Sequence, residues 1–484
     1  MIKKFEDVIA EQGRLVYTNV GDSMLPIVRE GDLLVIEAVK QPLKVGDVPL
    51  YKRDSGQYVL HRIVEIKRGK YSMKGDNRTW VERGITDRHI IGVLTAVIRN
   101  GKTFPVETPQ DYTVRIAKDV IYLLSCALNG EAPERERIAE MDLPEVFRIS
   151  QDHMLTAAVA FALEKTIPLP RLFDQAKKKA ICKLSLFEIE RNAISRELDN
   201  AGIWYLPLKG ILLQKDYPKA AMREMNDNDI LVDNTRMDDV KAIMEGLGYT
   251  CELYDLYGHD AYSKPPTLEF EMHRTLFTRD TMPEFMDYFA DIKSKTRQNG
   301  LACRLSDEDF YLYVTCHTYK HYIHAGSGLR SLADTYVFLR AHPDLDREYL
   351  DAELKKLRIA DFEEKMRVLS EKVFNGGELD EQEQKDLEYL ILSGNKGTIE
   401  NREYNQMISN LGDDDSKASK RRFIRSRFFI SGEDLKRRYP FFAKHKALYP
   451  VLLVYRPIKG ALTHPRGILK EYKKIKSFKK KENP

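Results

Sequence analysis

Two aspartates, Asp227 and Asp229, stand two positions apart just before the apolar run Ile230 to Val232. Alternate side chains of a strand point to the same face, so both carboxylates could reach one pair of divalent metal ions. Such ions can stabilise the attacking and leaving oxygens of an in-line phosphoryl displacement. A third carboxylate is expected from a neighbouring strand, where Glu271 is the best candidate and Glu269 is the alternative.

Two cationic positions precede this pair of acids. Lys209 and Gly210 form a turn, and a backbone without a side chain allows close approach to a phosphate while the lysine supplies charge. Arg223, four residues before Asp227, adds a second cation. The combination favours phosphate chemistry over a solvated acidic pair.

A second set of reactive residues lies near the amino terminus. Ser23 follows a Gly-Asp turn, and a serine hydroxyl becomes a good nucleophile only when a base removes its proton. His61, in a strand-like run, is the candidate base. Asp76 could orient its imidazole, and Glu82 is the alternative acid.

The motifs of the carboxyl-terminal part carry a family resemblance. The combination LKG, YP, R-x-x-x-D-x-D-I-L-V and E-x-H, followed by HTYKH and GLRSLAD, resembles the uncharacterised nucleotidyltransferase family within the polymerase-β-like superfamily, over roughly residues 111 to 472. The resemblance implies a nucleoside triphosphate as substrate and Mg²⁺ (or Mn²⁺) as cofactor. It implies triphosphate binding by Lys209, Gly210 and Arg223, metal binding by Asp227, Asp229 and Glu271, and a cleft lined by His273, His317, His321 and Arg330.

Some of these residues have other interpretations. His317 and His321 have the i,i+4 spacing of a zinc site but lack the accompanying glutamate pattern, so histidines of the core or surface are an alternative. Arg330 and Asp334 could form an i,i+4 ion pair. Asn228 stands where the family often has an apolar residue, and its side chain should point away from the metals.

The amino-terminal motifs SMLP, GDV, HRI, KGDN and IIGV resemble the type I signal peptidases and other S24/S26-like peptidases, in the branch that uses histidine as the base. The resemblance implies Ser23 as nucleophile, His61 as general base and Asp76 or Glu82 as the orienting acid. Family members normally carry a membrane anchor before the serine, whereas charged residues interrupt this stretch here. The alternative is a peptide-binding β module.

The elements that must position these groups fall into four predicted regions. Residues 1–107 show short β-branched and apolar runs between turns, which predict a signal peptidase-like β domain. Residues 108–200 have apolar positions three and four apart, which predict a helical lead-in. Residues 201–300 predict an α+β nucleotidyltransferase core, and residues 301–484 predict helices with a basic tail. The predicted fold is therefore multidomain, all-β and then α+β embedded in helices.

Composition limits the class of protein further. A chain of 484 residues is too long for one ordinary hydrophobic core. A formal charge of +4 by itself indicates no nucleic-acid partner. Five scattered cysteines predict reduced thiols. Neither a signal peptide nor a transmembrane segment is visible, so we expect a cytoplasmic protein. The lysine-rich end, residues 470–484, is expected to be a solvated terminus, with anionic lipid or nucleic acid as alternative contacts.

These features lead to one hypothesis and two alternatives. The hypothesis is a bifunctional enzyme that transfers a nucleotidyl group from a nucleoside triphosphate to a peptide or protein, joined to a serine peptidase-like domain, in the maturation of ribosomally made peptides. The first alternative is a peptide-binding β module joined to a nucleotide-sensing fold. The second is transfer to RNA, for which no RNA-binding motif is present.

Overall fold

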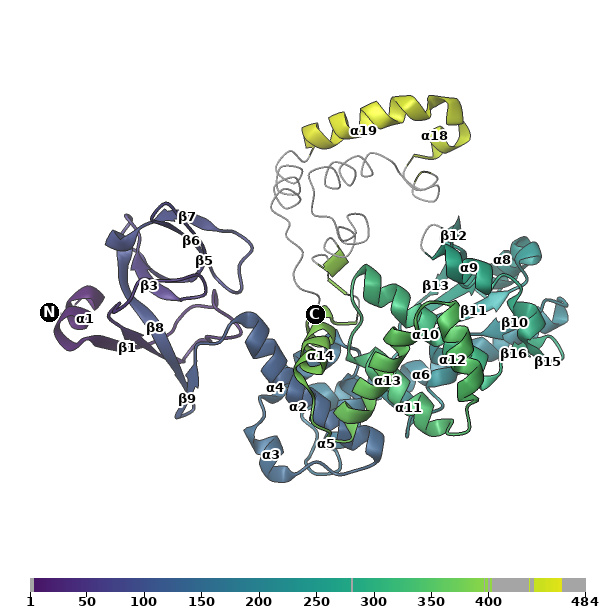
Figure 1. Cartoon of the computed structure of the whole chain (residues 1–484), viewed down its shortest axis with the longest axis horizontal. Coiled ribbons are helices and arrows are strands. Elements are labelled where there is room, and N and C mark those ends of the chain that lie inside the picture. Colours follow the sequence, from purple (N-terminus) through teal and green to yellow (C-terminus); the bar gives the residue numbers. More distant parts are fainter. Residues whose placement is uncertain are drawn as a thin grey trace. The chain divides into compact units, whose positions relative to one another are not determined.

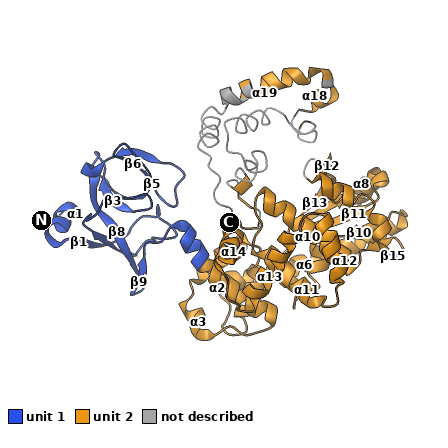
Figure 2. Cartoon of the chain, in the orientation of Figure 1, with its two compact units in different colours: residues 1–115 blue, residues 116–484 orange. Residues whose placement is uncertain are grey.

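The computed structural model describes residues 4–279, 282–395, 397–398, 401–402, 435 and 439–463. The chain divides into two compact units, residues 1–115 and residues 116–484 (Figure 2).

The first unit is built mainly of β-strands, with the short helix α1 (Phe5–Gln12) at one end and the start of α2 (Pro109–Asn129) at the other. Its larger sheet has the order β1-β2-β8-β3-β4, with β9 paired to the far part of β8. All of its pairings are antiparallel. The strands are β1 (Arg14–Thr18), β2 (Leu33–Glu37), β3 (Pro49–Lys52), β4 (Tyr58–Leu60), β8 (Ile90–Arg99) and β9 (Lys102–Pro105).

A smaller antiparallel sheet completes the first unit (Figure 1). It contains β5 (Arg62–Lys67), β6 (Lys70–Lys74) and β7 (Glu82–Ile85). Ile63, Met73 and Ile85 point from these three strands into one buried cluster with Tyr51 of β3. This packing joins the two sheets, so His61, at the junction of β4 and β5, is held between them.

Helices open the second unit, as the apolar spacing predicts. They are α2 (Pro109–Asn129), α3 (Arg135–Glu140), α4 (Leu143–Asp152), α5 (Thr156–Leu163) and the long α6 (Arg171–Asn200). Every residue of α5 is buried, so this short helix forms the centre of the helical part. A mixed sheet follows in the order β12-β13-β14-β11-β10-β16-β15.

The middle of this sheet sets the positions of the predicted acids. Its strands are β10 (Tyr205–Pro207), β11 (Asn228–Val232), β12 (Thr250–Leu256), β13 (His259–Lys264), β14 (Leu268–His273), β15 (Arg297–Asn299) and β16 (Ala302–Arg304). β11 pairs antiparallel with β10 and parallel with β14. All five residues of β11 are buried, which fits a central strand covered on both faces.

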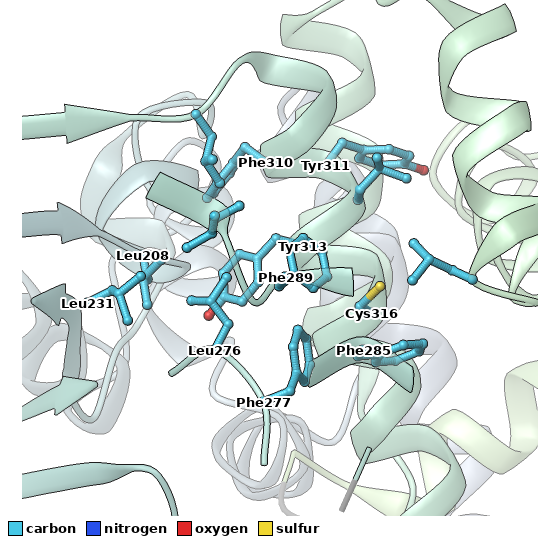
Figure 3. Packing of buried hydrophobic residues seen from close by; sticks show 14 of the residues in the cluster. Leu208, Leu231, Leu276, Phe277, Phe285, Phe289, Phe310, Tyr311, Tyr313 and Cys316 are labelled. Atoms are coloured by element: carbon cyan, nitrogen blue, oxygen red, sulfur yellow. The ribbon is translucent and has the colours of Figure 1, made fainter. Parts of the chain in front are cut away.

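Helices cover both faces of the sheet. On one face, Ile230 and Phe270 pack against Phe187 of α6 and Met244 of α8 (Met237–Gly246). On the other face, Leu231 packs with aromatic residues of α9 (Pro283–Tyr288) and α10 (Asp307–His324). Figure 3 shows this second cluster, in which Leu208 and Leu231 lie beside Tyr313 and Phe289. The fold class expected from the sequence is confirmed.

Within the residues that the structure describes, the remaining helices are α11 (Leu329–Ala341), α12 (Arg347–Lys356), α13 (Ala360–Phe374), α14 (Glu381–Ser393), α18 (Pro440–Lys444) and α19 (Tyr449–Thr463). Among the described residues, no helix combines the length and the apolar character that crossing a membrane requires. The basic tail predicted at residues 470–484 lies outside the described residues.

A buried histidine links two helices of the second unit and makes its stability depend on pH. His153 follows α4, and its Nδ1 accepts a hydrogen bond of 3.1 Å from the backbone N–H of Leu329, the first residue of α11. Burial lowers the pKa of His153 to about 4. The unfolded chain, with a histidine pKa near 6.5, therefore binds more protons at weakly acid pH.

We expect the free energy of unfolding to fall as the pH drops from about 6.5 towards 4, by at most about 3 kcal/mol from His153. Urea unfolding at a series of pH values measures this. In His153→Asn the amide oxygen can accept the same hydrogen bond and cannot be protonated. The free energy of unfolding of this variant should therefore depend less steeply on pH. An unchanged slope would contradict the assignment to His153.

Candidate active sites

Strand register brings two of the predicted acids together in the second unit. Asp229 of β11 lies directly opposite Glu271 of β14 in the parallel pairing. Both side chains point to the same face as Leu231, towards α10, because alternate residues share a face. Asn228 points to the other face, where its Oδ1 accepts a hydrogen bond of 2.8 Å from Arg191 of α6. The expectation that Asn228 turns away from the acids is confirmed.

Two cations lie against Asp229. Lys209 Nζ is 2.7 Å from Asp229 Oδ1, and His273 Nε2 is 2.8 Å from the same oxygen. His273 Nε2 is also 3.3 Å from Glu271 Oε2. Placed two residues after Glu271 on β14, His273 faces the same side and bridges the two carboxylates.

The charges of this cluster shift one another's pKa values. Burial alone would raise the pKa of Asp229, but Lys209 and His273 outweigh it and the pKa lies well below its usual range. Burial would lower the pKa of His273, yet its hydrogen bonds to Asp229 and Glu271 raise it. The pKa of Lys209 is raised in the same way, since Asp229 outweighs the effect of burial. Within this cluster, the acids and the bases thus stabilise one another's charged forms.

The donor set of the cluster suits a divalent cation. One oxygen each of Asp229 and Glu271 and one nitrogen of His273 all lie within 4.8 Å of one another. Two carboxylates and an imidazole are ligands that Mn²⁺ and similar ions accept. His259 Nε2 lies 3.6 Å from the other oxygen of Glu271, so the second oxygen of that carboxylate has its own partner.

Asp227, the other predicted metal ligand, lies beside this group rather than within it. It precedes β11, so the strand register does not fix its side chain. Burial raises the pKa of Asp227, and the negative charges of Asp229 and Glu271 raise it further. The structure therefore brings His273 into the cluster, and the sequence reasoning had placed it only along the cleft. Glu269, the alternative third acid, is exposed.

The turn at Lys209 and Gly210 differs from the phosphate-binding turn expected there. Lys209 has φ of 42° and ψ of −117°, a strained conformation for a residue with a side chain. A Cβ on Gly210 would lie 2.3 Å from a terminal nitrogen of Arg223 and 2.5 Å from Met225 Sδ. The space on the Cβ side of Gly210 is therefore filled by side chains of the protein.

Arg223, which the family resemblance predicts to bind the triphosphate, is held by a buried ion pair. Its Nε and a terminal nitrogen are each 2.8 Å from an oxygen of Asp334 in α11. Tyr217 donates a hydrogen bond of 2.7 Å to the same carboxylate. Because both oxygens of Asp334 are engaged in this way, Arg330 bonds elsewhere and donates to the Glu224 carbonyl at 3.0 Å. The suggested pair of Arg330 with Asp334 is replaced by that of Arg223.

Helix α10 contributes the neighbouring histidines. His317 and His321 lie one turn apart, with their Nε2 atoms 3.2 Å from each other. Burial lowers the pKa of His317, and the charge of Lys209 lowers it further. Between them lies Lys320, which the sequence reasoning missed although it is part of the HTYKH motif. Burial and the charge of Lys209 lower the pKa of Lys320 to about 8, which places a readily neutralised amine near the acids.

In the first unit, His61 reaches its acid through a tyrosine. Its Nδ1 is 3.3 Å from the Tyr51 hydroxyl, which donates a hydrogen bond of 2.6 Å to Glu82. Because the hydroxyl donates to Glu82, it accepts from His61 Nδ1, which leaves Nε2 unprotonated. Arg53 holds Glu82 through both carboxylate oxygens, at 2.8 and 2.6 Å. Burial lowers the pKa of His61.

The Ser23 backbone lies near the Cδ2 edge of the His61 ring, with Gly75 between them. The Ser23 carbonyl accepts a hydrogen bond of 2.9 Å from the Asn77 N–H. A Cβ on Gly75 would lie 2.6 Å from that carbonyl oxygen and 3.1 Å from His61 Cδ2. Only a glycine at this position lets the strand pass between the serine backbone and the histidine ring.

Asp76, the first of the two predicted orienting acids, serves another purpose. Its oxygens are 2.9 and 2.7 Å from the guanidinium of Arg62, and both side chains are buried. This pair leaves Glu82, by way of Tyr51, as the acid connected to His61.

A cluster of acids and cations on a mixed sheet between helices fits a transferase domain. A β unit with a serine and a buried histidine fits a peptidase-like domain. Residues 139–375 match the family of uncharacterised nucleotidyltransferases, and residues 4–95 match the Peptidase S24-like family. The chain is thus a fusion of an S24-like domain with a nucleotidyltransferase domain of that family. No curated protein and no solved structure matches it.

The role given to Arg223 predicts a stability effect. Asp334→Asn removes the charge that compensates the buried guanidinium, and we expect it to lower the free energy of unfolding by about 3 kcal/mol. Asp351→Asn, which removes the partner of Arg347 in an exposed i,i+4 pair, is the matched control and should cost less than about 0.5 kcal/mol. Chemical unfolding measures both. Equal, small losses of unfolding free energy in the two variants would argue against a stabilising ion pair between Arg223 and Asp334.

Proposed function

We propose that the second unit catalyses metal-dependent nucleotidyl transfer from a nucleoside triphosphate. The observation that carries this proposal is the convergence of Asp229, Glu271 and His273 on one point beside Lys209, within the part of the chain that matches the nucleotidyltransferase family. Acidic ligands next to a fixed cation suit a reaction in which negative charge moves onto a leaving pyrophosphate.

In this proposal Asp229, Glu271 and His273 hold the divalent ion, and Asp227 stays a predicted ligand beside them. A bound divalent ion supplies charge stabilisation for the phosphoryl oxygens. Lys209 supplies positive charge to the triphosphate from a backbone conformation that fixes its position. Because an imidazole is among the ligands, we expect Mn²⁺ to support transfer at least as well as Mg²⁺.

The proposed acceptor is a peptide or protein, and the fusion with an S24-like domain supports it. That domain has a peptide-directed fold, so one molecule could be bound by both units in the maturation of a ribosomally made peptide. Transfer to RNA, and nucleotide sensing without transfer, are the alternatives. A cytoplasmic location also stays a prediction.

A second proposed activity is serine peptidase chemistry in the first unit. The supporting observation is the connected series His61, Tyr51 and Glu82, which leaves Nε2 of His61 free to accept the proton of Ser23. Tyr51 acts as a positioning residue because it carries the link from the imidazole to Glu82. The alternative is a peptide-holding module with the same fold.

The transferase proposal predicts opposite behaviour for two glutamates of one strand. Glu271→Gln should lower nucleotide transfer about 100-fold, since it removes a charged ligand at the metal position. Glu269→Gln, two residues away and exposed, is the matched control and should stay within about twofold of the parent. The measurement follows label from each nucleoside triphosphate into protein, peptide or RNA with Mn²⁺ or Mg²⁺. Transfer at the parent rate in Glu271→Gln would refute the site.

The peptidase proposal predicts a particular pH dependence. Burial lowers the pKa of His61 below 6.5, so its neutral form persists into weakly acid solution. The cleavage rate should therefore decline only below about pH 6.5. Ser23→Ala and His61→Ala should abolish cleavage of a peptide library. Tyr51→Phe should lower the cleavage rate and shift the pH at which the rate declines in acid solution.

Cleavage that survives in Ser23→Ala would leave the domain as a binding module. A matched control is Tyr58→Phe, which removes a hydroxyl bonded to Glu6, away from the series, and should leave the rate unchanged.

A further inference from the structure

A pocket of about 260 Å³ lies beside the acidic cluster and has no role in the proposal above. It is bounded by α6, by the junction of α4 and α5, and by the segment that leads into β11. Phe187 and Met225 give it an apolar floor. Ala176 and Ala180, one turn apart on α6, leave the space open because their side chains are short.

Two lysines of α6 line this pocket. Lys179 and Lys183 are one helical turn apart, so their side chains lie on the same face of the helix. Lys179 is exposed, whereas Lys183 is half-buried and donates a hydrogen bond of 3.2 Å to the Asn226 carbonyl. Burial lowers the pKa of Lys183, while the charges of Glu269 and Asp227 oppose this effect.

The other charged groups of the lining are already engaged. Arg223 is held by Asp334, as described above. The carboxylate of Glu224 accepts a hydrogen bond of 2.8 Å from the Ala157 N–H in α5. The lysines therefore supply the charge that a ligand would meet, above an apolar floor.

The pocket extends from the α6 side of the sheet to the edge where β11 begins. Phe187 belongs to the core between the sheet and α6, whereas Lys209 contacts Asp229 on the face covered by α10. Asn226, which lines the pocket, directly precedes Asp227. The pocket and Lys209 thus approach the acids from two sides.

We propose that this pocket binds an anionic group, a phosphate or a carboxylate, of the acceptor molecule. The assignment to the acceptor rests on the proposed nucleotidyl transfer. In that reaction a nucleophilic oxygen of the acceptor forms a bond to the α-phosphorus while the bond from this phosphorus to pyrophosphate breaks, and the acceptor's proton passes to solvent. In-line displacement requires the acceptor and the leaving group on opposite sides of the phosphorus. With the triphosphate beside Lys209, the pocket is the side left for the acceptor.

The volume fits one group rather than a whole substrate. Pockets for drug-sized ligands enclose roughly 300 to 1,000 Å³, so 260 Å³ suits an anionic group and the small apolar body that carries it. The site therefore recognises one feature of the acceptor and leaves its remainder outside.

Three aldehydes test the pocket on the full chain without any transfer reaction. Pyridoxal phosphate carries a phosphate, carboxybenzaldehyde carries a carboxylate, and benzaldehyde carries neither. The amine of Lys183 forms an imine with release of water, borohydride reduces the imine, and peptide mass mapping gives the rate at each lysine. We expect at least one charged aldehyde to label Lys183 about tenfold faster than benzaldehyde does, and the faster of the two identifies the preferred anion.

Two variants make the outcome specific. Lys179→Gln should abolish the preference for the charged aldehyde at Lys183, because it removes half of the charge of the lining. Lys178→Gln is the matched control, since Lys178 is exposed on the same helix and pairs with Asp174 at 2.7 Å, and it should leave the preference unchanged. Equal labelling by charged and neutral aldehydes would overturn the anion site.

A separate measurement distinguishes the acceptor from the donor. Binding of a fluorescent nucleoside triphosphate with Mn²⁺ should change less than about twofold in the double variant Lys179→Gln, Lys183→Gln. A loss of tenfold or more would give the pocket to the triphosphate and overturn its assignment to the acceptor. Failure of the transferase proposal itself would appear instead as unchanged transfer in Glu271→Gln, so the two failures are distinguishable.

Discussion

The pairing of β11 with β14 places the carboxylates of Asp229 and Glu271 opposite each other. Other parts of the second unit supply the groups that offset the repulsion between them. Like charges this close disfavour the folded state unless cations offset them. Lys209 and His273 do so at 2.7 and 2.8 Å from Asp229. To bring Lys209 there, the chain leaves β10 through a strained turn, and the glycine that follows gives room to Arg223. Asp334 of α11 then fixes Arg223. A helix far along the sequence therefore supports the turn that carries Lys209.

The two units use histidine for opposite purposes, and the surroundings decide which. His61 is buried with a tyrosine hydroxyl as its partner, and its pKa is lowered, which favours the neutral imidazole. His273 is also buried but lies between two carboxylates, which raise its pKa and favour the charged imidazolium. Burial acts in the same direction on both imidazoles, and the neighbouring charge reverses its effect in one of them.

The sequence predicted the parts that depend on local periodicity. Strand alternation placed Asp229 and Glu271 on one face and turned Asn228 to the other, and the turn-separated apolar runs predicted the all-β unit. The same alternation would have placed His273 with Glu271, since the two are separated by one residue. Long-range partners were beyond such reasoning: Asp334 holds Arg223 from a distant helix, and Glu82 reaches His61 only through Tyr51. Side-chain packing decides these contacts, and the spacing of residues along the chain does not predict them.

The two cations at Asp229 have a consequence for the supply of metal in the cell. Lys209 and His273 offset the negative charges of Asp229 and Glu271 from within the chain. The charges of these two carboxylates are therefore compensated without a bound ion. This differs from small zinc domains, in which metal binding and folding are one event. In the proposed metal site, an incoming ion would compete with positive charges that are already in place. Loading would then be an exchange reaction whose extent depends on the metal available in the cell.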